Sequence, residues 1–73
     1  MKISEFEDAW KESKTTIKDI RLNNFTTHIY ADYYHIEKDG CGLKDDLGFI
    51  HLFRKSQYIA RVRSEDIISL TKL

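Results

Sequence analysis

Three histidines and one cysteine are the softest potential metal ligands in this sequence. A protein zinc site takes nitrogen or thiolate ligands, and its sequence normally shows them as close pairs a few residues apart. His28, His35, Cys41 and His51 form no such pair. We therefore expect no metal and no cofactor, and we predict histidines that pack beside a sheet with locally satisfied nitrogens.

An acidic segment with two glycines, residues 39–46, is the next candidate for chemistry. Asp39, Asp45 and Asp46 offer oxygen ligands, but Cys41 and Leu43 occupy positions where a calcium loop of the EF-hand type needs oxygen. As a nucleophile, Cys41 would need a basic neighbourhood, and the acidic residues around it disfavour the thiolate. We predict a solvated loop. A chain of 73 residues leaves little room for a deep pocket, so we also predict that the protein is not an enzyme.

Tyrosine and arginine form the strongest constellation in the sequence. Both types are enriched at protein interfaces, and tyrosines beside cations can also stack on single-stranded nucleic acid. The alternative is that most of the tyrosines fill a small core with their hydroxyl groups at its rim. The set comprises Tyr30, Tyr33, Tyr34 and Tyr58 with Arg54, Arg61 and Arg63.

The composition indicates a single globular domain over residues 1–73. Apolar residues make up 41% of the chain and aromatic residues 12%. The formal net charge is zero, which argues against nucleic-acid binding by bulk charge, although residues 25–47 carry −3 and residues 48–73 carry +3. A single cysteine excludes an internal disulfide. Because no apolar run suits a signal peptide or a membrane span, we expect a cytoplasmic protein without a membrane partner.

The elements that would position these side chains centre on a hairpin at residues 48–63. This stretch is rich in aromatic and β-branched residues, and residues 54–57 are its only polar break. We favour a four-residue loop there over the two-residue loop Lys55-Ser56, because tight turns prefer Gly or Asn. Either loop places Phe53 opposite Tyr58, and the register then continues with Leu52 opposite Ile59.

This register divides the hairpin into two faces, since side chains alternate along a strand. The predicted core face holds Phe49, His51, Phe53, Tyr58, Ala60 and Val62. The other face mixes aliphatic side chains with cations and must be covered by another element or used for binding. Our candidate partner-binding site combines this face with the turn and comprises Ile50, Leu52, Arg54, Lys55, Ile59, Arg61 and Arg63.

Residues 4–14 are predicted to form an amphipathic helix with Phe6 and Trp10 on its apolar face. Ser4 and Glu7 match a capping box at its start. The apolar stripe would allow the helix to continue to residue 22, whereas the β-branched residues 15–17 favour a strand at 16–22. The sequence leaves both alternatives open.

Strands are predicted at residues 25–38, 48–54, 57–63 and 67–72, and imperfect alternation in the first indicates two partly buried faces or a bulge near residues 32–34. The predicted fold is α+β, with an N-terminal helix before a small antiparallel sheet of four to five strands. A strand, a short polar turn and the segment 66–70 (DIISL) resemble the closing strand of small SH3-like and Sm-like barrels. The resemblance implies a meander curled into such a barrel. No Sm-type RNA-binding motif is present, so no site residue is carried over.

These features predict a small non-catalytic protein-binding module. Its size, its Ile and Lys content and its lack of motifs are similar to those of small phage and mobile-element proteins that bind a host protein. The alternative is a small β-barrel that binds nucleic acid through Arg54, Lys55, Arg61 and Arg63. A third alternative is a homo-oligomer that covers the mixed face by self-association.

Overall fold

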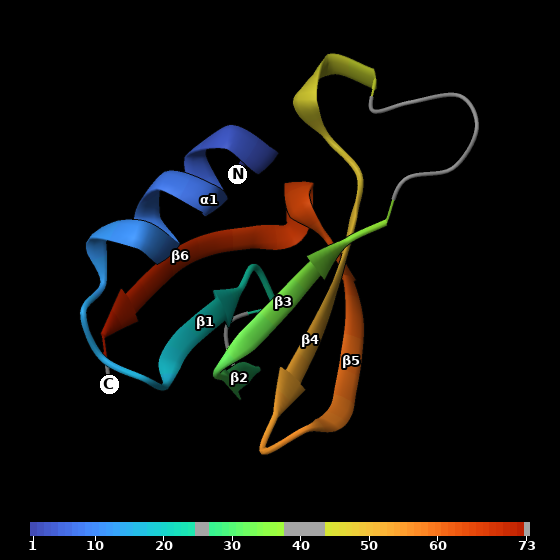
Figure 1. Cartoon of the computed structure of the whole chain (residues 1–73). Helices are drawn as coiled ribbons and strands as arrows, with labels where there is room; N and C mark the ends of the chain where they lie inside the picture. The colour runs from blue at the N-terminus through green and yellow to red at the C-terminus, as the bar shows by residue number, and fades with distance from the viewer. Residues whose placement is uncertain (25–26, 38–43, 73) are drawn as a thin grey trace.

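The computed structural model describes residues 1–24, 27–37 and 44–72, in which one α-helix precedes six strands (Figure 1). Helix α1 (Ile3–Glu12) is followed by β1 (Lys18–Leu22), β2 (His28–Ala31) and β3 (Tyr33–Ile36). A short 3-10 turn, η1 (Lys44–Asp46), leads into the hairpin of β4 (Phe49–Arg54) and β5 (Gln57–Arg63). A second, η2 (Ser64–Asp66), leads into β6 (Ile67–Lys72).

The strands form two antiparallel sheets of three strands, ordered β2-β1-β6 and β3-β4-β5. The α+β class and the N-terminal helix are confirmed. The sheet differs in detail, because six strands are divided between two sheets instead of four to five strands in one. Within the described ranges no strand pairing joins the two sheets into a closed barrel.

Asp32 lies where the predicted long strand divides. Residues 28–31 and 33–36 of that prediction are β2 and β3, which belong to different sheets, while residues 25–26 and 38 lie outside the described residues. The Asp32 backbone N–H donates to the Phe53 carbonyl at 2.9 Å, and its carboxylate accepts from the Lys55 backbone N–H at 3.0 Å. The irregularity expected near residues 32–34 is therefore a change of sheet.

The β4-β5 hairpin departs from its predicted register by one residue. Phe53 faces Tyr58 as predicted, but Leu52 then faces Ala60, so Ile59 forms a bulge between these pairs. The bulge exchanges the faces of the β5 residues beyond it, so Arg61 and Arg63 lie beside His51 and Phe49, and Ala60 and Val62 lie beside Leu52 and Ile50. The predicted core face is confirmed for Ala60 and Val62, which pack against the core, but it is wrong for Tyr58 and for the β4 residues. Ile50 is fully buried, as is Leu52, while Phe49, His51 and Phe53 lie half-buried on the opposite side.

The hairpin turn also differs from the loop that we favoured. Arg54 pairs with Gln57, so Lys55 and Ser56 form a two-residue loop, and their φ angles are 53° and 65°. Both residues occupy the left-handed region that tight hairpin turns require, although neither is Gly or Asn. The contact between Asp32 and the Lys55 N–H helps to hold this conformation, which costs a residue with a Cβ about 1–2 kcal/mol.

Replacing the turn by Lys55→Asn/Ser56→Gly should stabilise the protein by about 1 kcal/mol, because these residues adopt a positive φ readily. The measurement is urea unfolding of the variant and the wild type. Ser13→Gly is the control, because Ser13 has φ −76° and glycine brings no relief there. An unchanged or lower midpoint for the turn variant would contradict the two-residue loop.

Helix α1 begins one residue before the predicted capping box and is capped differently. The Lys2 backbone N–H donates to the Glu5 carboxylate at 2.9 Å. The Ser4 backbone N–H donates to both Asp46 carboxylate oxygens, at 3.2 and 3.3 Å, and its hydroxyl bonds the same carboxylate. The prediction that Ser4 and Glu7 cap each other is wrong. Asp46, 42 residues further along the chain, caps the helix instead.

Removing this cap should lower the free energy of unfolding by about 1 kcal/mol, the usual contribution of a side-chain helix cap. Asp46→Gly tests it against Asp45→Gly. Both aspartates have a positive φ, 59° and 56°, so glycine relieves the same backbone conformation in both variants. The difference between their urea midpoints isolates the side-chain contact, and equal midpoints would show that the cap contributes nothing.

The helix ends at Glu12, and the alternative of a strand within residues 16–22 is confirmed as β1. The core lies between the two sheets, with α1 beside β6 (Figure 1). Phe6 of α1 is fully buried, and its ring packs 5.1 Å from that of Tyr34. The core cluster is Phe6, Ile20, Ile29, Ala31, Ile50, Leu52 and Ile67.

Candidate functional site

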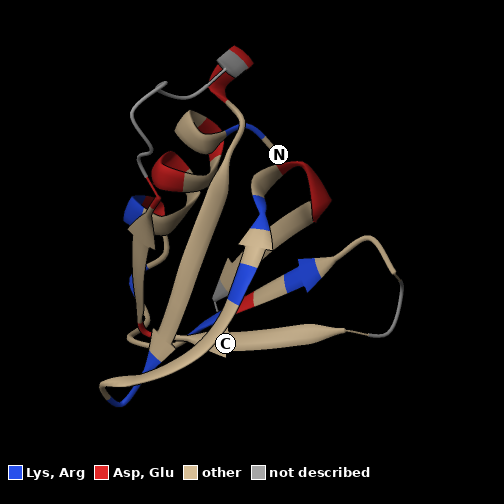
Figure 2. Ribbon diagram, turned by 90° about the vertical axis from the view of Figure 1, so that its right-hand side faces the viewer, with Lys and Arg blue, Asp and Glu red and all other residues tan. Residues whose placement is uncertain are grey.

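The seven residues of the predicted partner-binding site do not share one surface. Ile50 and Leu52 are fully buried between the sheets, so they cannot contact a partner in this fold. Ile59 is 38% exposed at the bulge. The cations Arg54 and Lys55 are exposed at the basic hairpin tip (Figure 2), and Arg61 and Arg63 are exposed opposite His51 and Phe49.

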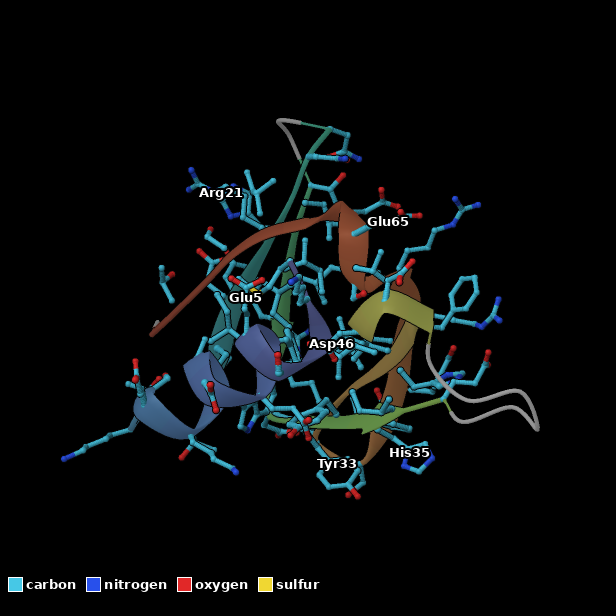
Figure 3. All side chains as sticks on the ribbon, turned by 90° about the horizontal axis from the view of Figure 1, so that it is seen from above. Glu5, Arg21, Tyr33, His35, Asp46 and Glu65 are labelled. Atoms are coloured by element: carbon cyan, nitrogen blue, oxygen red, sulfur yellow. The ribbon has the colours of Figure 1, made fainter. Side chains whose placement is uncertain are left out.

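A different surface, the outer side of β3-β4-β5, brings the aromatic residues of the hairpin together. Tyr33 and His35 point away from α1 (Figure 3), and Phe49, His51 and Phe53 of β4 lie beside them in register. We call this surface the aromatic face and define it as Tyr33, His35, Phe49, His51, Phe53, Tyr58 and Arg61. Tyr33 is 60% exposed and Tyr58 is 55% exposed.

The rings of the aromatic face pack against one another across three strands. The Phe53 ring lies 5.6 Å from Tyr33 and 5.4 Å from Tyr58, between centroids, and His51 lies 5.6 Å from Tyr58. Tilted and edge-on pairs at such distances are favourable beyond their buried area. The face is therefore a set of mutually supported rings, and a partner would meet a largely preformed surface.

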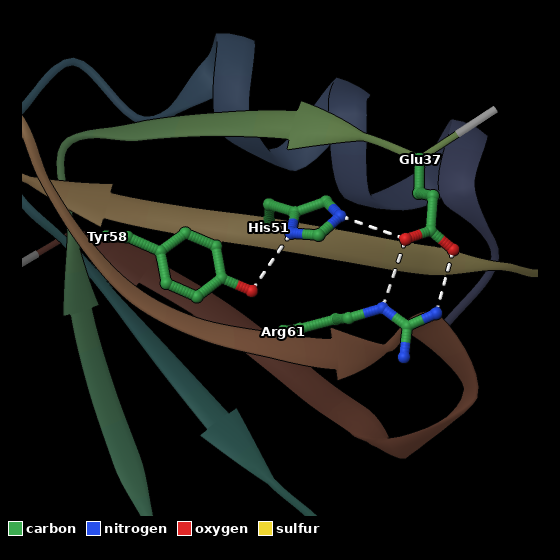
Figure 4. A network of polar contacts seen from close by, with 4 residues as sticks. All are labelled: Glu37, His51, Tyr58 and Arg61. Atoms are coloured by element: carbon green, nitrogen blue, oxygen red, sulfur yellow. Dashed lines mark hydrogen bonds and ion pairs between the residues drawn. The ribbon is translucent and has the colours of Figure 1, made fainter.

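A polar network ties the strands together at one end of this face (Figure 4). Glu37 accepts two hydrogen bonds from the Arg61 guanidinium, at 3.1 Å from Nε and 2.8 Å from Nη2. The His51 Nε2 lies 3.1 Å from the same carboxylate, and its Nδ1 lies 3.0 Å from the Tyr58 hydroxyl. With the proton on Nε2, His51 donates to Glu37 and accepts from Tyr58.

The electrostatics of this network favour the charged forms of Glu37 and Arg61. The Arg61 guanidinium lowers the pKa of the Glu37 carboxyl through its hydrogen bonds, and His51 contributes in the same direction. The guanidinium carbon also lies 3.5 Å from the centroid of the Phe49 ring, as in a cation–π contact. The positive charge of Arg61 is thus already engaged by a carboxylate and a ring.

The Glu37 carboxyl should titrate below its ordinary range in the folded protein. Because the Glu37 pKa is lowered, the Glu37–Arg61 pair stabilises the fold at pH values above the ordinary carboxyl pKa. This stabilisation is lost as the pH falls through the pKa that Glu37 has in the folded protein. NMR titration of the Glu37 side-chain carbon checks this in the wild type and in Arg61→Met. The pKa should rise in the variant, and equal values in both proteins would rule out Arg61 as the cause.

The remaining tyrosines and histidines lie elsewhere. Tyr34 points inward to the core, and Tyr30 is 38% exposed on the other sheet beside His28. The His28 Nδ1 lies 3.1 Å from the Asp19 carboxylate. The tyrosine set is therefore divided, with Tyr33 and Tyr58 on the aromatic face.

Sequence reasoning missed four members of the aromatic face, His35, Phe49, His51 and Phe53, as well as Glu37 of the polar network. The three β4 residues alternate as a strand face should, but they were assigned to the core because the bulge gives no sequence signal. Of the predicted acidic loop, residues 39–43 lie outside the described residues. No group of three histidine, cysteine, aspartate or glutamate side chains in the described part of the chain is arranged to hold a metal ion.

The aromatic face offers exposed rings for packing contacts and, at one end, a charged network for hydrogen bonding. Among the described residues, no helix is long and apolar enough to cross a membrane. No family model, curated protein or solved structure matches this chain.

Proposed function

We propose that this chain is a small, non-catalytic protein-binding module whose aromatic face contacts the partner. The observation that carries the proposal is the exposure of Tyr33 and Tyr58 on a supported aromatic surface around Phe53. Large, rigid rings with an arginine nearby are the residue types that dominate binding energy at protein interfaces. The partner we propose is a cytoplasmic host protein, as for the phage and mobile-element proteins that the sequence resembles.

The state of the cations favours a protein partner over nucleic acid. Arg61 is bound by Glu37, and Arg63 lies 3.4 Å from the Glu65 carboxylate. Binding to a phosphate backbone depends on cations that neutralise phosphates, and these two already have carboxylate partners. The balanced charge of the chain points the same way.

Single-stranded nucleic acid is the second candidate, and one observation favours it. Tyr33 and Phe53 line a depression with Asp32 and with Lys55 and Ser56 of the turn, beside the exposed Arg54. Rings beside cations are the elements on which bases stack. In this alternative, binding would weaken steeply with salt and be lost in Arg54→Glu/Lys55→Glu.

The protein-binding proposal predicts that Tyr33→Ala/Tyr58→Ala loses a partner that the wild type retains. Both side chains are exposed, so the double variant should fold normally while losing about tenfold or more in affinity. The measurement is affinity capture from host lysate, followed by titration of the captured protein in purified form. Tyr30→Ala is the matched control, because it removes an exposed tyrosine from the other sheet.

Retention of the partner by the double variant, or equal loss in the Tyr30 control, would contradict binding through the aromatic face. Fluorescence anisotropy with a labelled oligothymidylate at low and high salt tests nucleic acid in parallel. Light scattering tests self-association, because a stable oligomer that disappears in the double variant would mean that a second copy covers the face.

A further inference from the structure

Strand β3 is an edge of its sheet, and its outer backbone groups are unpaired within the described residues. The Glu37 N–H donates to the Phe49 carbonyl at 3.0 Å, and His35 faces His51 in the same ladder. Backbone groups alternate in direction along an antiparallel strand, so those of Tyr34 and Ile36 point away from β4. No backbone hydrogen bond of the described chain reaches them from the open side.

Helix α1 forms the other wall of a groove along this edge. The groove is lined by Glu7 and Trp10 of α1 and by Tyr33, Tyr34, His35 and Ile36 of β3. Side chains from both faces of β3 take part, which places the groove over the strand edge itself. Figure 3 shows Tyr33 and His35 on the side of β3 away from α1, so the groove borders the aromatic face.

The groove combines an apolar wall with an acidic one. The Trp10 ring lies 4.8 Å from the Tyr34 ring between centroids. The Tyr34 hydroxyl donates to one Glu7 oxygen at 3.2 Å, and burial followed by Glu7 raises the pKa of Tyr34, so the phenol remains a neutral donor. No ion pair among the described side chains involves Glu7.

Helix α1 as a whole is negatively charged, like the Glu7 side of the groove. Four carboxylates and one lysine lie between Ile3 and Glu12, and Figure 2 shows the acidic residues along the helix. An occupant of the groove therefore gains from carrying a cation. An extended occupant also gains because its backbone N–H and C=O groups can form hydrogen bonds with the outward-facing backbone groups of β3.

We propose that the groove takes an extended, basic segment of a partner protein, which adds as a strand to β3 and places a Lys or Arg side chain beside Glu7. This inference rests on the proposed function and names the kind of segment by which the partner binds. Residues opposite Tyr34 and Ile36 would point toward α1, and the intervening residues would extend the aromatic face beside Tyr33 and His35. The four residues of β3 limit the contact to one short segment.

Hydrogen exchange of the free protein tests whether the edge is open. The amide of His35 belongs to the ladder with β4, whereas those of Tyr34 and Ile36 face the groove. We expect the latter two to exchange about tenfold faster or more, as solvent-exposed strand amides do. Equal protection of all three amides would mean that the edge is already paired, and the proposal would be wrong.

A synthetic segment tests the occupant directly. The probe is the capped peptide Thr-Val-Thr-Lys-Thr-Val-Thr, compared with the same peptide carrying Glu in place of Lys. In an NMR titration the Lys peptide should bind with a dissociation constant near or below about 1 mM and slow the exchange of the Tyr34 and Ile36 amides. The Glu peptide should bind about tenfold more weakly, because its carboxylate faces Glu7.

Glu7→Gln gives the matched test of the acidic wall. Glutamine retains an acceptor for the Tyr34 hydroxyl but removes the charge, so affinity for the Lys peptide should fall about two- to fivefold. Asp8→Asn, one residue along the same helix at an exposed position, should leave the affinity unchanged. Equal effects of the two variants would show that only the general charge of the helix matters, and the Glu7 site would be wrong.

The outcomes separate this inference from the proposed function. Absence of binding by the Lys peptide, or perturbation centred on another strand edge, overturns strand addition at β3. If Tyr33→Ala/Tyr58→Ala still abolishes protein capture in that case, the binding module stands without the groove. If the peptide binds at β3 while Tyr33→Ala/Tyr58→Ala still captures the partner, the edge site stands and the aromatic face is not the partner surface.

Discussion

The structure depends on a bend at one residue, Asp32. Its N–H and its carboxylate both bond the β4-β5 hairpin, one at the Phe53 carbonyl and the other at the Lys55 N–H. A single chain segment can therefore leave one sheet as β2 and enter the other as β3. The same contacts bring the tip of the hairpin to the start of β3, where Tyr33 begins the aromatic face.

The bulge at Ile59 is the second constraint, and it decides what the outer surface contains. Beyond the bulge, Arg61 faces His51 and Arg63 faces Phe49. Arg61 thereby comes within reach of Glu37, which follows β3 directly. Without the extra residue, Arg61 would share a side with the buried Ile50 and Leu52, where an unpaired guanidinium is strongly unfavourable. The bulge thus allows the aliphatic side chains to be buried while the arginine side chains remain exposed.

Local features of the fold were predictable from sequence, whereas features that depend on distant contacts were not. The helix, the hairpin strands and the pairing of Phe53 with Tyr58 follow from composition and spacing. The division at Asp32 and the Ile59 bulge arise from how two sheets enclose one core, which no local pattern encodes. The tight turn at Lys55 and Ser56 contradicts turn preference because tertiary contacts override it. For the candidate site, Tyr33, Tyr58 and Arg61 were named from their residue types, and the structure places these three on the aromatic face. His51 and Phe53 were assigned to the core because, without the bulge on β5, they share a face with Ala60 and Val62.

The cap on α1 has a consequence for how the chain folds. A helix of ten residues is marginal by itself in water, because nucleation costs more than so few hydrogen bonds return. Here the group that completes its first turn comes from 42 residues later in the sequence, so a large loop must close before the helix gains that bond. Helix formation is thereby coupled to the arrival of the segment that enters β4. The N-terminal segment should consequently behave as part of one cooperative unit with the second sheet, and the chain should fold more slowly than its helix content and small size suggest.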